Sequence, residues 1–178
     1  MRTIWALLGT FVLVVTTAQA QKFGYVDTQY ILSQMPDYKE AQRQIEELSV
    51  AWTEEIQEKY LEIERLYTEL QAEKVLLTKE MYDERLAEIQ AMEDELNEYQ
   101  NKVFGFEGQF FLKKKELIKP VQDKVFEAVE KVAKDLRLAI MFDKSSDLVM
   151  IYTDPIHDYT EYVLEELGLK DENDLIND

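Results

Sequence analysis

The sequence predicts an α+β protein that is mostly helical, with a long antiparallel helical hairpin projecting from a small β-sheet body. Three observations support this fold class. Residues 37–119 contain no proline, and glycine occurs there only at positions 105 and 108. Apolar residues recur every three or four positions through this segment, as they do in the seam of a coiled coil. Short β-branched and aromatic runs, which are typical of strands, lie outside it.

The first twenty residues have the pattern of a secretory signal peptide. A basic start at Arg2 precedes an apolar run, Ile4–Val15, and the small-x-small sequence Ala18-Gln19-Ala20. The apolar run is shorter than the roughly 20 residues that a membrane-spanning helix needs. We therefore expect cleavage before Gln21 and export of a soluble mature chain.

The composition excludes several kinds of bond and partner. Because the chain has no cysteine, it forms no disulfide, and stability must come from packing or from oligomerisation. The formal net charge is −17, and loss of Arg2 with the leader makes the mature chain one unit more negative. Such an acidic surface argues against nucleic acid as a partner, since phosphate contacts need basic surface. It weighs equally against contact with an anionic membrane or lipopolysaccharide.

The arm, residues 37–119, is predicted to consist of two antiparallel helices of about 40 residues, each about 60 Å long. Its tip is expected near residues 76–80, where Thr78 is the best candidate for a helix N-cap. A reversal at Thr78 places Pro36 opposite Pro120. One continuous helix or an intermolecular coiled coil is the alternative. The two predicted seams comprise Tyr38, Ala41, Ile45, Leu48, Trp52, Ile56, Tyr60, Ile63, Tyr67 and Leu70, and then Tyr82, Leu86, Ile89, Met92, Leu96, Tyr99, Val103, Phe106 and Phe110.

The body is predicted to combine residues 21–36 with residues 120–178. A strand at 23–27 and a helix at 28–35 precede Pro36, and a further helix is expected after Pro120. Two apolar runs, 138–142 and 148–152, are expected to form strands joined by a hairpin turn at 143–147, with a last helix from about Asp158 to Gly168. Three short strands make little core, so the body is expected to oligomerise. The residues assigned to it are Phe23, Tyr25, Val26, Ile140, Phe142, Val149, Ile151 and Tyr152.

A band of aromatic residues interrupts the returning helix. Half of the eight phenylalanines lie within residues 104–111, together with two glycines, and Trp52 is expected to lie opposite them. The band is interpreted either as packing at the root of the arm or as an apolar lining that contacts other molecules. Gly105 and Gly108, with Pro36 and Pro120, are candidate hinges. If the backbone is helical at both glycines, alanine there should raise thermal stability. The phenylalanines are Phe104, Phe106, Phe110 and Phe111.

Catalytic chemistry has little support in the sequence. His157 is the single histidine, there is no cysteine, and no serine lies in a nucleophile-elbow or P-loop context. Asp143 and Asp147 fall short of a calcium loop, which supplies six or more oxygen ligands. We therefore predict no enzymatic activity, no metal site and no cofactor.

Both ends of the mature chain resemble the Skp (OmpH-like) periplasmic chaperones. Residues 149–164, VMIYTDPIHDYTEYVL, follow the family pattern of an apolar strand, Tyr-x-Asp-Pro, and then Asp-x-Thr before an apolar helix. Residues 23–32, FGYVDTQYIL, are similar to the opening strand and helix of the family. The middle of the chain is similar only as a charged helical hairpin. The motif residues are Asp154, Pro155, Asp158 and Thr160.

The resemblance implies a jellyfish-like homotrimer whose three arms enclose a cavity. It also implies ATP-independent holdase activity in the periplasm, with unfolded outer-membrane proteins as clients. The best-known members are basic, whereas this chain is strongly acidic. The main alternative is a structural or adaptor coiled-coil protein of the cell envelope that docks a fixed folded partner.

Overall fold

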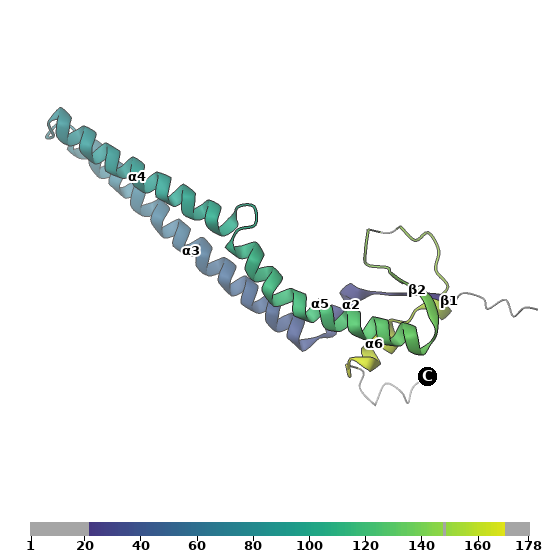
Figure 1. The fold of residues 1–178 in the computed structure, drawn as a ribbon. Coiled ribbons are helices and arrows are strands. Elements are labelled where there is room, and N and C mark those ends of the chain that lie inside the picture. Colours follow the sequence, from purple (N-terminus) through teal and green to yellow (C-terminus); the bar gives the residue numbers. More distant parts are fainter. Residues whose placement is uncertain (1–21, 148, 170–178) are drawn as a thin grey trace, which may run out of the picture.

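The computed structural model describes residues 22–147 and 149–169, so the predicted leader and its cleavage before Gln21 lie outside the described residues. Two long helices and the start of a third form an extended arm, and the remaining elements gather at one end of this arm (Figure 1). Within the described ranges, no helix combines the length and the hydropathy that a membrane crossing requires. The elements are β1 (Lys22–Val26), α2 (Thr28–Gln34), α3 (Pro36–Glu73), α4 (Lys79–Phe104), α5 (Gln109–Asp135), β2 (Leu138–Asp143), the 3-10 turn η2 (Pro155–His157) and α6 (Thr160–Glu166).

Helices α3 and α4 form an antiparallel hairpin within one chain, so the alternative of one continuous helix is wrong. The chain reverses at residues 74–78, and the Thr78 hydroxyl accepts a hydrogen bond from the Met81 N–H at 3.3 Å, which caps α4. Across the hairpin, the Tyr67 hydroxyl donates to Glu93 at 2.9 Å. Apolar side chains at the predicted seam positions form the core of the hairpin. The buried ones are Ile63, Leu70, Ile89 and Leu96.

The returning path is broken between α4 and α5, which corrects the prediction of an unbroken second helix. A turn at residues 105–108 loops out of the arm (Figure 1) and is closed by the Gly108 N–H, which donates to the Gly105 carbonyl at 2.9 Å. Both glycines have extended backbones, and a β-carbon at Gly105 would lie 2.3 Å from the Asn101 carbonyl oxygen. Glu107 adopts a left-handed φ of 52°. Alanine at the glycines therefore overlaps the backbone and cannot stabilise this conformation.

Pro120 lies inside α5 rather than at the start of a new helix. Proline removes one backbone N–H and crowds the preceding turn, but it does not prevent a helix from continuing where packing supports it. Here the helix buries Val121, Val125 and Val132 in the body. The prediction that a further helix begins after Pro120 is wrong, because one helix runs through this residue from the arm into the body.

The body core joins segments from both ends of the chain. Strands β1 and β2 pair in parallel, with Gly24 opposite Met141 and a register irregularity after Lys22. Helix α5 packs beneath them, and α2 and α6 complete the core (Figure 1). A two-stranded sheet has little stability of its own, so these helices hold it in place. The buried core residues are Val26, Ile31, Leu32, Met35, Val121, Val125, Ala128, Val132, Val163 and Leu164.

The predicted third strand and its hairpin are wrong for the described residues, because 149–152 form no strand. The turn after β2 docks on the start of α2 instead. The Asp143 carboxylate accepts hydrogen bonds from the Thr28 N–H at 3.2 Å, the Thr28 hydroxyl at 2.6 Å and the Ser145 N–H at 2.9 Å. Burial raises the pKa of Asp143, but these hydrogen bonds outweigh it and leave the pKa below its usual value. The chain is thereby directed away from the edge of β2.

Candidate functional site

The residues of the sequence motif at 154–160 hold the C-terminal helix on the body. The Asp154 carboxylate accepts from the Ile156 N–H at 3.1 Å, and Pro155 begins the 3-10 turn η2. The Asp158 carboxylate accepts from the Thr160 N–H at 2.9 Å. Thr160 is buried, and its hydroxyl accepts a hydrogen bond from the Asp27 N–H at 3.0 Å. The motif thus ties α6 to the junction between β1 and α2.

Thr160→Val is expected to destabilise the body by about 1–2 kcal/mol, because it leaves the part-buried Asp27 N–H without its partner while keeping the side-chain shape. Urea unfolding at one fixed protein concentration measures the effect. Thr68→Val is the matched control, since the hydroxyl of Thr68 is exposed and bonds only to the Glu64 carbonyl of its own helix at 3.0 Å. Equal unfolding midpoints for the two variants would contradict a structural role for the Thr160 hydroxyl.

Three of the five predicted band residues pack together beside the break in the arm. The Trp52 ring meets the Phe104 ring edge-on, with centroids 6.3 Å apart and planes at 88°. Phe104 also contacts Phe110, with centroids 5.7 Å apart. Since these rings come from α3, α4 and α5, they join the three helices where the backbone hydrogen bonds of the returning path are interrupted. Val103, which precedes Phe104 in the sequence, is fully buried, as the predicted seam requires.

The other two band residues face solvent. Phe106 is 98% exposed at the turn between α4 and α5, and Phe111 is about half exposed on α5. The prediction that Phe106 continues the seam is wrong, because the helical period stops at the end of α4. The band is therefore divided between three packed aromatic rings and two that face solvent, of which Phe106 is almost fully exposed.

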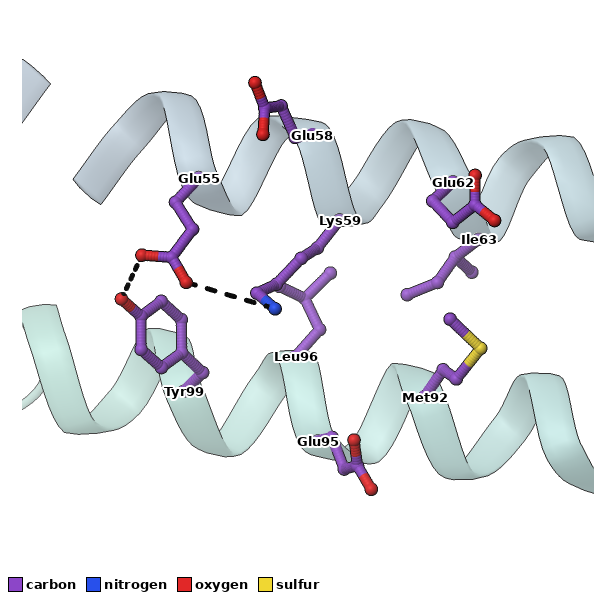
Figure 2. A pocket seen from close by; sticks show the side chains of 9 residues that line it. All are labelled: Glu55, Glu58, Lys59, Glu62, Ile63, Met92, Glu95, Leu96 and Tyr99. Atoms are coloured by element: carbon purple, nitrogen blue, oxygen red, sulfur yellow. Dashed lines mark hydrogen bonds and ion pairs between the residues drawn. The ribbon is translucent and has the colours of Figure 1, made fainter. Parts of the chain in front are cut away.

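A groove of about 600 Å³ runs between α3 and α4 (Figure 2). Glu55, Lys59 and Tyr99 point toward one another at one end of it. The Glu55 carboxylate accepts a hydrogen bond from the Tyr99 hydroxyl at 2.5 Å and lies 3.9 Å from the Lys59 ammonium. This hydrogen bond raises the pKa of Tyr99. The remaining lining combines apolar and acidic side chains: Glu58, Glu62, Ile63, Met92, Glu95 and Leu96.

The groove could not be predicted from the sequence pattern, which places Tyr99 and Ile63 in the seam of the hairpin. A signal was available, since a tyrosine in an otherwise apolar seam needs a partner for its hydroxyl. The antiparallel register brings Glu55 within reach of that hydroxyl.

The body carries a broad exposed apolar surface. Tyr25 and Val26 are buried in the core, but the other six predicted body residues are exposed, with Ile151 97% and Val149 85% accessible. Beside them a cavity of about 400 Å³ is lined by Phe23, Phe142, Met150, Tyr152 and neighbouring residues. Exposed apolar side chains around such a cavity are typical of interaction sites. The exposed residues are Phe23, Ile140, Phe142, Val149, Ile151 and Tyr152.

The family described as "Outer membrane protein (OmpH-like)" matches residues 22–167, from β1 through α6. The chain belongs to the OmpH-like family. The match confirms the resemblance found at both ends of the chain. It also covers the arm, where the sequence resembled the family only as a charged hairpin. No curated protein matches the chain.

The OmpH-like fold is also found among solved structures. A protein from Caulobacter crescentus CB15, assigned as an outer membrane chaperone (OmpH-like), is similar with a TM-score of 0.68. The match covers 84% of each chain at 12% sequence identity, so this likeness supports the fold alone. In the present chain, this fold consists of long helices that project from a small two-stranded sheet.

The OmpH-like chain brings no candidate metal ligands together within residues 22–147 and 149–169, where no group of three or more His, Asp or Glu is placed to hold an ion. His157 packs against the Phe23 ring, with centroids 5.4 Å apart. Asp143, considered above as a calcium ligand, accepts hydrogen bonds from Thr28 and Ser145 instead.

Proposed function

We propose that this protein is an ATP-independent periplasmic holdase chaperone that binds unfolded outer-membrane proteins and prevents their aggregation. The observation that carries the proposal is membership of the OmpH-like family over residues 22–167. The arm suits the role because it presents apolar side chains, including Phe106, to solvent without enclosing them. Many weak apolar contacts can hold an unfolded chain without a defined sequence.

The working unit in this proposal is a homotrimer. Ile151, Val149 and Tyr152 are exposed in a single chain, and the body sheet has only two strands. Both features are unfavourable in isolation and are relieved when other subunits cover them. Three arms rooted in one body would enclose a cavity for the client. Residues 105–108 and Pro120 are the proposed points at which an arm bends.

The proposed location is the periplasm, reached through the leader that the sequence predicts before Gln21. A holdase there works without nucleotide, and the proposal assigns the protein no catalytic step, metal or cofactor. The chaperone keeps the client soluble during transit and releases it when the client folds into a membrane.

Light scattering tests the proposal directly. An outer-membrane β-barrel is diluted from urea into buffer with the mature protein at several-fold molar excess and without nucleotide. We expect aggregation to be suppressed. Unchanged aggregation at every ratio would overturn the proposal. Recovery of a single stoichiometric folded partner by affinity capture, with no unfolded clients, would instead favour the adaptor alternative.

A further inference from the structure

The acidic charge of this protein is concentrated in the hairpin formed by α3 and α4. These two helices contain 19 acidic and 7 basic residues. Helix α5 contains 5 acidic and 7 basic residues, so the root of the arm is slightly basic. The hairpin thus has a net charge of −12, which is the largest share of the formal charge of −17 on the whole chain.

The few basic residues of the hairpin are largely neutralised by neighbouring acids. Arg43 pairs with Glu40 and Glu47, and Arg65 pairs with Glu62 and Glu69. The remaining arginine, Arg85, pairs with Glu73 across the hairpin. Lys59 and Lys79 also lie beside Glu55 and Asp83 of their own helices. Five of the seven basic residues are thus paired with acids of the hairpin, and little positive charge remains to attract an acidic partner.

The groove between α3 and α4 combines this excess of acid with an apolar floor. Ile63 and Leu96 are buried at its base, and Met92 is exposed beside them. Glu58 and Glu95 lie on opposite sides of the groove, on the outer sides of the two helices (Figure 2). Both side chains are exposed, and neither makes a hydrogen bond or an ion pair with another described residue. The groove thus offers an apolar strip flanked by two uncompensated carboxylates.

We propose that this groove selects extended client segments in which lysine or arginine is interspersed with apolar residues. An apolar client side chain would cover Met92 and Leu96 while its cationic neighbours approach Glu58 and Glu95. The proposal rests on the proposed function and specifies its client class as cationic unfolded polypeptide. Charge complementarity supports this occupant, because the surrounding hairpin repels acidic segments and concentrates basic ones.

Two labelled peptides test the inference with the full mature protein. Both have the same apolar residues in the same order, and one carries six lysines where the other carries six glutamates. Fluorescence anisotropy gives the dissociation constants. We expect the lysine peptide to bind at least about tenfold more tightly at low salt, and the difference to shrink in high salt as screening shortens the Debye length. Equal affinity for the two peptides at low salt would overturn the inference.

A pair of substitutions locates the effect in the groove. Glu58→Gln with Glu95→Gln is expected to weaken binding of the lysine peptide about threefold to tenfold, the range for two exposed charge contacts. The matched control, Glu64→Gln with Asp94→Asn, removes the same charge from exposed positions of α3 and α4 that do not line the groove. Equal weakening by the two double variants would overturn the assignment to the groove.

Failure of this inference and failure of the proposed function give different results. If the protein suppresses aggregation of the unfolded β-barrel but binds both peptides equally, only the cationic preference is wrong. If it binds the lysine peptide selectively but suppresses no aggregation, the groove is a cation-selective docking site and the holdase proposal is wrong. The aggregation assay and the peptide assay therefore report on separate claims.

Discussion

Ile151→Asp is expected to dissociate the proposed trimer into monomers. Ile151 is 97% exposed in the single chain, so the substitution removes no packing within that chain. In an assembled body the same position would bury a carboxylate without a partner, which costs several kcal/mol. We therefore expect the trimer to dissociate at concentrations at least about 100-fold higher than for the wild-type protein. Mass photometry or sedimentation velocity measures the change.

The arm tip provides a matched control for Ile151→Asp. Leu76 is also an aliphatic residue that faces solvent, but it lies in the turn between α3 and α4, far from the body (Figure 1). Leu76→Asp introduces the same kind of charge and should leave the mass of the particle unchanged. A trimer that survives Ile151→Asp, or dissociates equally with Leu76→Asp, would contradict the proposed use of the exposed body surface.

The helical hairpin could be predicted from the sequence because its determinants are local. The seam of apolar residues repeats with the helical period, and Thr78 supplies a cap where that period restarts. An antiparallel reversal then fixes which positions meet. Trp52 accordingly lies against Phe104, as the reversal at Thr78 requires. Local pattern and long-range contact agree in this part of the molecule.

The third strand was mispredicted because a strand needs an edge to pair with. Residues 149–152 are as apolar as β2, but no described edge within one chain receives them. Hydropathy alone cannot distinguish a strand of this chain from a segment that is covered only by another molecule. The hydrogen bonds from Thr28 to Asp143, which turn the chain away, join residues 115 positions apart and leave no periodic signal.

The two glycines at the break were visible in the sequence, but the sequence did not predict that the returning helix is interrupted at residues 105–108. The residue type alone does not show whether a glycine lies in a helix or in a turn. The extended backbone at Gly105 and Gly108 in the structure decides this. The same uncertainty affected Pro120, which a helix tolerates here because the residues after it are buried in the body. In both cases the tertiary environment decided the local conformation.

Phe106→Ser is expected to weaken client capture without destabilising the protein. Phe106 is 98% exposed and makes no ring contact with Trp52 or Phe104, so its replacement should change the free energy of unfolding by less than about 0.5 kcal/mol. An apolar side chain at this position gains burial only when another molecule covers it. We expect more of the protein to be needed for half-maximal suppression of β-barrel aggregation, and light scattering measures that amount.

Phe104→Ala separates packing from client contact within the same band. Phe104 touches both Trp52 and Phe110, so truncation removes the contacts that join α3, α4 and α5 at the break. Because the ring is partly exposed, we expect a loss of about 2 kcal/mol, below the range for a fully buried phenylalanine. Thermal unfolding should therefore respond to Phe104→Ala and not to Phe106→Ser, while aggregation suppression responds to Phe106→Ser. If Phe106→Ser leaves suppression unchanged, the exposed ring is no client contact. The functional part of the band must then lie elsewhere, with Phe111 as the remaining exposed member.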